Sequence, residues 1–153
     1  MRRIAAGLAA ACALSTIASG THSADAALPP LKFGAFAADP RGNDLPVSNT
    51  KLNAEWIQLT NTTTRAINLT GYTVRDNGDN HIFRFPRNFV LGAKKTVTIR
   101  TGRGTASATN QYFGKTTQYV WNNTGDTARL VNSRGAVTHR CTYTKALSGM
   151  KYC

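Results

Sequence analysis

Only a few side chains in this sequence could perform acid–base chemistry. Beyond the N-terminal segment, the candidate bases are His81, His139, Glu55 and five aspartates. A hydrolase needs a nucleophile held beside such a base, and no spacing in the sequence brings one there. His81 follows a turn and His139 stands beside Arg140, so both are expected to be partly exposed structural residues. The sequence therefore predicts a protein that is not an enzyme. A small hydrolase is the alternative, which turnover abolished by changing either histidine would support.

The spacing of possible metal ligands does not predict a metal site. Asp39, Asp44 and Glu55 could meet at one end of the domain and offer hard oxygen ligands to calcium. Their spacing is not that of a calcium-binding loop, so turn-capping aspartates and a solvated or hydrogen-bonded Glu55 are favoured, with calcium left open. Two cysteines twelve residues apart, with His81 and His139 as the remaining histidines once the N-terminal segment is removed, match no compact zinc spacing. No metal or cofactor is predicted.

The N-terminal segment has the pattern of an export signal. Two arginines precede the apolar, uncharged run 4–18, which is too short to span a bilayer comfortably. Ala24 and Ala26 then supply the small side chains that signal peptidase accepts. We therefore expect residues 1–26 to be a signal peptide, and the remainder to be secreted, extracellular or cell-wall associated, with no membrane span.

Removal of that segment leaves only two cysteines, Cys141 and Cys153. In an oxidising compartment a pair of thiols normally becomes a disulfide. We predict this bond, which would pin the C-terminal tail 144–153 to the last strand and stabilise the fold by about 2 to 3 kcal/mol.

The charge of the remaining chain is strongly positive. Residues 27–153 carry 17 basic and 6 acidic side chains, a net charge of +11. Such an excess favours salt-dependent association with polyanions, so nucleic acid or an anionic cell-wall polymer is an expected partner. The basic residues are dispersed, and strand alternation suggests one face built from Arg75, Arg84, Arg100 and Arg129. The alternative is that the charge serves solubility alone and that the partner is another protein.

The chain outside the signal reads as short strands separated by turns rich in Asn, Asp and Gly. Several segments alternate apolar and polar residues, with Phe83 and Phe85 around Arg84 and with Val97 and Ile99 between polar neighbours. No helix is predicted, and the stretches 37–53 and 102–114 are expected to be long loops. The predicted strands span residues 31–36, 55–61, 66–69, 72–75, 81–85, 96–100, 118–121, 128–132 and 137–143.

Several of these segments resemble one known family in order along the chain. The run NAEWIQLTN at 53–61, followed by INLTGY at 67–72, resembles the opening strands of lamin tail domains. The central runs NGD, FRFP and VTI and the later LVNSRG at 130–135 are similar to the same family. The resemblance covers residues 31–143, after a short lead at 27–30, and places the chain among secreted bacterial members.

The resemblance implies an all-β fold, an immunoglobulin-like antiparallel β-sandwich of about eight or nine strands. Because the family supplies interaction modules rather than a reaction, it implies a non-catalytic binding or scaffold role, with a monomer expected. The matched residues expected to fill the core are Trp56, Leu59, Tyr72, Phe83, Phe85, Val97, Ile99 and Leu130.

Overall fold

Eleven short strands and one helix follow one another in residues 27–153, the part of the chain that the computed structural model describes. The predicted signal peptide lies outside the described residues. The elements are β1 (Leu31–Ala37), α1 (Asn49–Ala54), β2 (Trp56–Asn61), β3 (Ile67–Asn68), β4 (Thr73–Arg75), β5 (Ile82–Arg84), β6 (Val90–Leu91), β7 (Thr96–Arg100), β8 (Asn110–Tyr112), β9 (Gly125–Val131), β10 (Val137–Thr144) and β11 (Met150–Tyr152).

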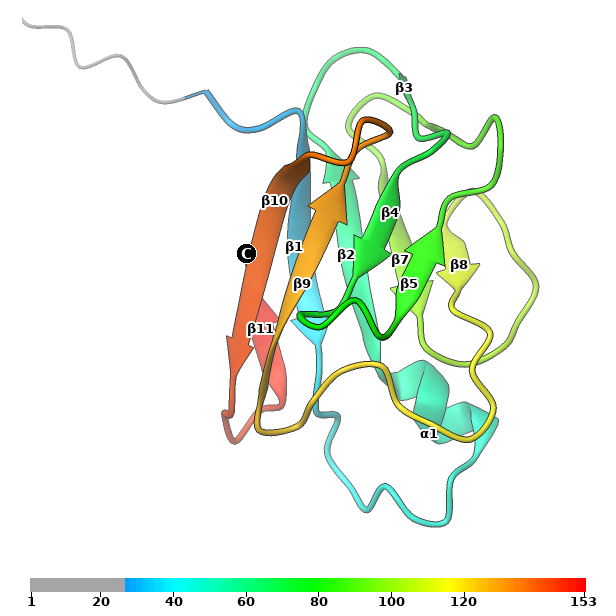
Figure 1. Cartoon of the computed structure of the whole chain (residues 1–153), viewed down its shortest axis with the longest axis vertical. Helices are drawn as coiled ribbons and strands as arrows, with labels where there is room; N and C mark the ends of the chain where they lie inside the picture. Colours follow the sequence, from blue (N-terminus) through cyan, green and yellow to red (C-terminus); the bar gives the residue numbers. More distant parts are fainter. Residues whose placement is uncertain (1–26) are drawn as a thin grey trace, which may run out of the picture.

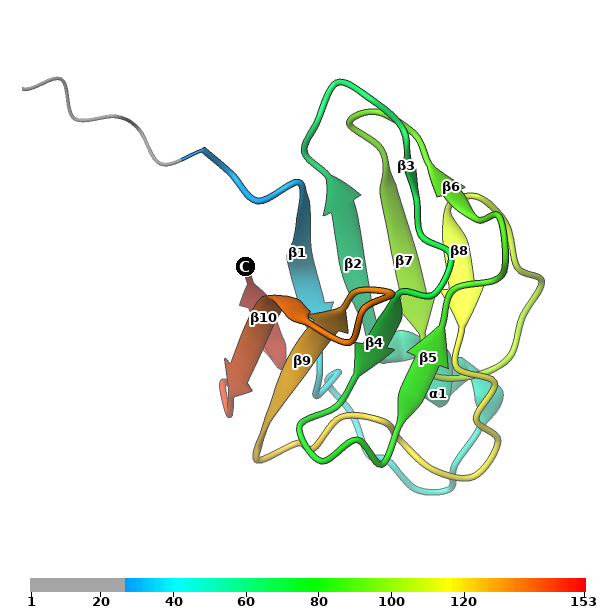
Figure 2. The ribbon, with the colours of Figure 1, turned by 45° about the horizontal axis from the view of Figure 1, so that its top comes forward.

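The strands form two main sheets that face each other, as Figures 1 and 2 show. One sheet has five strands in the order β11-β1-β2-β7-β8, and the other has four in the order β10-β9-β4-β5. β3 and β6 form a small separate pair. All pairings are antiparallel except that of β7 with β8. These layers confirm the predicted immunoglobulin-like sandwich.

The core lies between the two sheets and follows the predicted alternation. Leu59, Val97, Ile99 and Leu130 are fully buried, and Phe83 and Phe85 are nearly so. The two phenyl rings meet edge to face at a centroid distance of 4.9 Å. Burial of such side chains is the dominant favourable contribution to folding.

The core prediction is wrong for Trp56. Alternation along β2 directs Glu55, Ile57 and Leu59 inward, so Trp56 points outward and is only half-buried. The size of the indole suggested a core position, whereas its parity in the strand placed it on the other face. Tyr72 is also half-buried and packs against the border of the core.

Three predictions of local structure are also wrong. Residues 118–121 form no strand, because the backbone amides of Val120 and Trp121 donate to the buried Glu55 side chain. The expected loop 37–53 contains α1, whose N-cap Ser48 accepts a hydrogen bond from the Lys51 amide at 3.3 Å. Its single turn and a half is too short to leave a periodic pattern, and burial of Leu52 supports it. The expected loop 102–114 contains β8.

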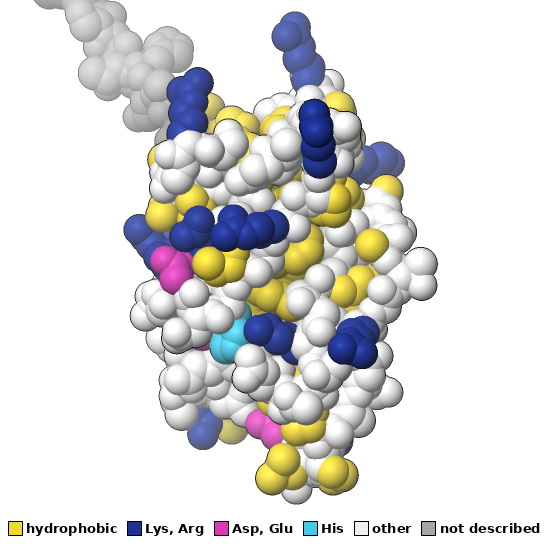
Figure 3. All heavy atoms as spheres, turned by 45° about the vertical axis from the view of Figure 1, so that its right-hand side comes forward, with side chains coloured by type: hydrophobic (Ala, Val, Ile, Leu, Met, Phe, Trp, Pro, Cys, Tyr) yellow, Lys and Arg dark blue, Asp and Glu magenta, His cyan; other side chains and the backbone are white. Residues whose placement is uncertain are grey.

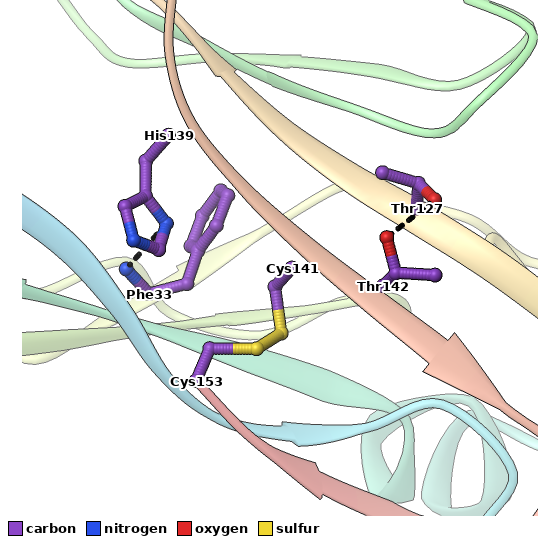
Figure 4. Close-up of a disulfide and its surroundings, with 6 residues drawn as sticks. All are labelled: Phe33, Thr127, His139, Cys141, Thr142 and Cys153. Atoms are coloured by element: carbon purple, nitrogen blue, oxygen red, sulfur yellow. Dashed lines mark hydrogen bonds between the residues drawn. A yellow bond between two sulfur atoms is a disulfide. The ribbon is translucent and has the colours of Figure 1, made fainter.

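A disulfide joins the two sheets along one side of the sandwich. Cys141 lies in β10 of the four-stranded sheet, and Cys153 follows β11 of the five-stranded sheet; their Cα atoms are 5.8 Å apart. Figure 4 shows this bond beside His139 of β10 and Phe33 of β1. There the Phe33 amide donates to His139 Nδ1 at 3.4 Å. The pairing agrees with the cysteine prediction, and it attaches the tail to both layers.

No helix in the described part of the chain has the length and apolar character needed to cross a membrane.

Candidate functional site

Of the two described histidines, His81 has the geometry closer to that of a catalytic acid–base pair. It lies in the turn between β4 and β5. Its Nδ1 is 3.0 Å from Asp76 Oδ2, and its backbone amide donates to Asp76 Oδ1 at 3.1 Å. An acid–base pair of this kind needs a nucleophile at the other ring nitrogen. His81 Nε2 instead faces the side-chain amide of Gln118 at 3.2 Å. The pair therefore holds the turn closed and, among the described residues, orients no nucleophile.

His139 is likewise a structural residue in the geometry observed. Its Nδ1 accepts the Phe33 amide proton, which requires that nitrogen to be unprotonated. Burial, with the nearby charge of Lys32, lowers the pKa of His139 below its ordinary value. The imidazole therefore acts as a neutral hydrogen-bond acceptor between the two sheets.

Glu55 is the most unusual charged residue in the described chain. It is fully buried, immediately before β2, at the end of the core. The amides of Val120 and Trp121 donate to its two carboxylate oxygens at 2.9 and 3.0 Å, and the Thr101 hydroxyl also hydrogen-bonds to it. One side chain thereby anchors the strandless segment 113–124 and the start of the loop after β7.

Burial strongly favours the neutral form of this carboxyl group. It raises the pKa of Glu55 to about 8, against the three hydrogen bonds, which lower it; the charge of Asp44 adds a smaller upward contribution. A raised pKa alone is typical of some catalytic acids, but the carboxyl atoms here are enclosed by backbone. Glu55 therefore serves the fold.

The remaining acidic residues at this end are also engaged within the protein or dispersed. Asp126 accepts the amide protons of Asn77, Asn122 and Thr127 at 2.7 to 3.1 Å. Asp44 accepts from the Asn123 amide group at 2.9 Å. Within residues 27–153 no group of three or more His, Cys, Asp or Glu side chains is placed to share a metal ion. Asp39, Asp44 and Glu55, the open calcium alternative, are therefore not assembled into such a group.

The structure divides the four arginines predicted to form one basic face. Arg75, Arg84 and Arg129 lie on β4, β5 and β9, on the outer side of the four-stranded sheet. Arg100 lies on β7 of the opposite sheet, so its inclusion was wrong. Alternation predicts which way a side chain points but does not reveal which strands are neighbours.

Two of those arginines are also compensated by one acid. Asp79 Oδ1 lies 3.5 Å from Arg75 Nη1 and 2.7 Å from Arg129 Nη2. Arg129 further donates to the backbone oxygen of Asp76 at 2.6 Å. Arg84 is exposed and forms no ion pair with a described residue. The outer face of this sheet therefore has less free positive charge than its sequence suggested.

A different basic surface is formed by the loops at the opposite end from α1. These loops, residues 62–66, 85–89, 92–95 and 132–136, join strands whose directions bring all of them to one end, at the top of Figure 1. They contain no Asp or Glu. The Lys and Arg side chains of these four loops are all exposed, and we call this set the basic end: Arg65, Arg87, Lys94, Lys95 and Arg134.

None of these five cations forms an ion pair with a described residue. Lys94 does donate to the Thr62 backbone oxygen, so its charge is held near the surface. Figure 3 shows Lys and Arg side chains projecting from the very top of one face with no acidic side chain beside them, whereas an acidic side chain lies next to the Lys and Arg group lower on the left. Charges of one sign without partners produce the potential that attracts an anionic molecule.

Comparison with protein families gives a match that spans most of the chain. The model of the Lamin Tail Domain family matches residues 25–145. The chain belongs to the lamin tail domain family. A comparison with curated proteins gives no match.

Membership of this family agrees with the observed geometry. Lamin tail domains are non-catalytic, immunoglobulin-like modules with interaction or scaffold roles. The match ends at residue 145, so β11 and Cys153 lie beyond it. In this lamin tail domain the extension therefore adds an edge strand and an inter-sheet disulfide.

Sequence reasoning missed the basic end of this lamin tail domain. A signal was present, since the four loop segments contain five basic residues and no acidic one. To use it, the loops would have to be assigned to the same end, which requires the number and direction of all intervening strands. The two-residue strands β3 and β6 leave too short a pattern for that assignment.

Proposed function

We propose that this lamin tail domain is exported from the cell and is a non-catalytic module that holds an anionic polymer at its basic end. The observation that carries the proposal is the uncompensated set Arg65, Arg87, Lys94, Lys95 and Arg134, in loops without a carboxylate. Phosphate groups of nucleic acid or of a cell-wall polymer suit such a surface, because each neutralised phosphate releases a bound counterion.

The form of the surface favours recognition of the polymer backbone rather than of sequence. The five basic residues stand on four loops, and these loops expose hydroxyl groups such as Thr64 and Ser133 beside them. Cations and hydroxyl groups contact phosphate and sugar, whereas sequence is read at base edges. Binding is therefore expected to be independent of nucleotide sequence and sensitive to salt.

The test measures binding of the purified protein to double-stranded DNA and to an anionic wall polymer over a salt series. A variant with Arg65, Lys95 and Arg134 changed to Glu should bind more weakly, and its logarithmic salt slope should fall by about 0.9 for each phosphate that the protein no longer neutralises. The matched control changes Arg41, Lys115 and Lys145 to Glu, which alters the net charge equally but leaves the basic end intact.

The control decides between location and net charge. If both variants weaken binding equally, the basic end is not the site. If the unmodified protein binds neither polymer at low salt, polyanion binding is wrong, and a structural or protein-interaction role is the better interpretation. Export is tested separately: the protein should be found outside the cell with an N-terminus at Ala27, and full-length protein inside the cell would contradict it.

A further inference from the structure

Among the described residues no second sheet covers the outer face of the five-stranded sheet, although the Asn53 backbone of α1 and Gly104 approach it at Arg100 and Tyr112. The residues of β2 and β7 that point inward are fully buried, whereas those that point outward are half-buried. None of the five strands contains Asp or Glu. The face therefore presents uncharged polar and aromatic side chains, with Lys32 and Arg100 as its outward cations on the three central strands.

Aromatic side chains stand on alternate strands of this face. Trp56 of β2 pairs in register with Arg100 of β7, and Arg100 pairs with Tyr112 of β8. The two aromatic residues thus share one row across the sheet, about 10 Å apart at the usual strand spacing. Tyr152 of the edge strand β11 adds a third aromatic ring, which is 76% exposed.

The residues between these rings are small or polar. β1, between β11 and β2, carries Gly34 and Ala35 at a bulge in the pairing with β2. The Gln58 side chain lies against Gly34, since a Cβ added there would be 3.7 Å from Gln58 Oε1. The β1 side chains between Tyr152 and Trp56 are therefore small, whereas Tyr152 is exposed and Trp56 and Tyr112 are half-buried.

Polar groups on the same face are free to bind a ligand. The side chains of Gln58 and Thr98 form no hydrogen bond with any described residue. Arg100 donates through Nε to Asn110 and through Nη1 to the Asn53 backbone oxygen, which fixes the guanidinium and leaves Nη2 unused. The backbone at Gly104 packs so closely against the Tyr112 ring that a Cβ there would collide with its Cζ, so the loop after β7 holds this ring in place and covers part of it. Groups fixed before binding lose little entropy when a ligand arrives.

We propose that this face binds an extended, β-linked polysaccharide, whose pyranose rings stack on Trp56 and Tyr112. The apolar face of a sugar ring suits an aromatic platform, and the spacing of the two rings is comparable to the length of a disaccharide unit. Gln58 and Arg100 lie in position to hydrogen-bond sugar hydroxyl and acetamido groups. This site is separate from the basic end and does not depend on polyanion binding.

A single-stranded nucleic acid could also stack its bases on such rings, but the charges argue against it. Binding of single strands needs a groove of cations that follows the backbone. Along this face Arg100 is already partly engaged and Lys32 lies at the far end of β1. Sugar rings need no such track, so the polysaccharide is the better fit.

The experiment titrates the purified protein with a soluble hexasaccharide of N-acetylglucosamine and with one of glucose. The chain has two tryptophans, and Trp121 is buried, so Trp56 is the fluorescent reporter on the surface. We expect saturable quenching or a blue shift with at least one sugar. By calorimetry, Trp56→Ala and Tyr112→Ala should each weaken binding by about tenfold or more, whereas Trp56→Phe should retain most of it.

Two comparisons make the result decisive. Arg134→Glu, at the basic end, should leave sugar affinity unchanged, and Trp56→Ala should leave salt-dependent DNA binding unchanged. Absence of any fluorescence change with both sugars in the unmodified protein would overturn the proposal, whether or not the variants fold. It would also be overturned if Trp56→Ala abolished binding of a single-stranded oligonucleotide while neither sugar bound.

Discussion

The two ends of the sandwich use their charged residues in opposite ways. At the end that carries α1, five of the six carboxylates of residues 27–153 accept hydrogen bonds or form ion pairs within the protein. At the basic end, the five cations form no ion pair with a described residue. The carboxylates therefore stabilise turns and loops, and the positive charge that remains lies away from them. The net charge of the chain indicates an excess, but pairing decides where that excess can act.

Removal of the Glu55 carboxyl group tests the first half of this comparison and should have the largest effect. Glu55→Ala would leave the buried amides of Val120 and Trp121 without acceptors, and we expect it to lower the free energy of unfolding by about 3 kcal/mol or more. Chemical denaturation measures the loss. DNA affinity of the folded variant should be unchanged, because the basic end is at the opposite end of the sandwich.

A smaller change at the same site provides the control. Thr101→Val removes one hydrogen-bonding partner of Glu55 and leaves the two backbone amides satisfied, so it should cost about 1 kcal/mol. Equal stability of Glu55→Ala and the unmodified protein would show that the carboxyl group does not anchor the segment 113–124.

The pH dependence of stability sharpens the comparison. Because burial raises the pKa of Glu55 to about 8 from 4.5, the folded state binds more protons than the unfolded state between these values. The contribution of Glu55 is therefore fully present below pH 4.5 and is lost as the pH rises through 8, with a slope of at most about 1.4 kcal/mol per pH unit. Denaturation midpoints over this range should show the decline, and Glu55→Gln should lack it. An identical profile in that variant would contradict the assignment.

Release of the compensated arginines would make the sheet face resemble the basic end. Asp79→Ala frees Arg75 and Arg129 beside Arg84, so affinity for DNA at low salt should rise severalfold. Stability should change by no more than about 1 kcal/mol, because the Asp79 side chain is 43% exposed. Asp39→Ala is the matched control, since it removes one negative charge that forms no ion pair with a described residue. An equal gain in both variants would mean that net charge alone controls binding.

His139 should give the smallest effect, with the opposite sign to Glu55. Its pKa is lowered in the folded state, so the unfolded state binds more protons as the pH falls below about 6.5. Stability from His139 is thus present above that pH and declines as the pH falls through the lowered pKa. His139→Asn supplies an acceptor that does not titrate, and the difference between the two profiles at about pH 5 to 7 measures the contribution of the imidazole. No difference would show that the contact with Phe33 is not coupled to protonation.

Alternation within strands explains most of what sequence reasoning predicted correctly. The positions of Leu59, Val97, Ile99 and Leu130 follow from a period of two, because one face of each strand must be buried. The same rule places Trp56 outward and Glu55 inward, so both could have been read from the sequence had parity been preferred to residue size. The disulfide was predicted from the two cysteines that remain after the predicted signal peptide, although its connection of two layers was not.

Several features of this protein could be determined from the sequence alone. They are the all-β class, the family, the inward residues of the longer strands and the excess of positive charge. These are local or compositional properties, which survive without knowledge of the neighbours of any strand. Only the tertiary structure placed Arg100 on the opposite sheet, paired Asp79 with two arginines and gathered the five cations at one end. Strand order, loop direction and ion pairing join residues far apart in the chain, and no local pattern carries that information.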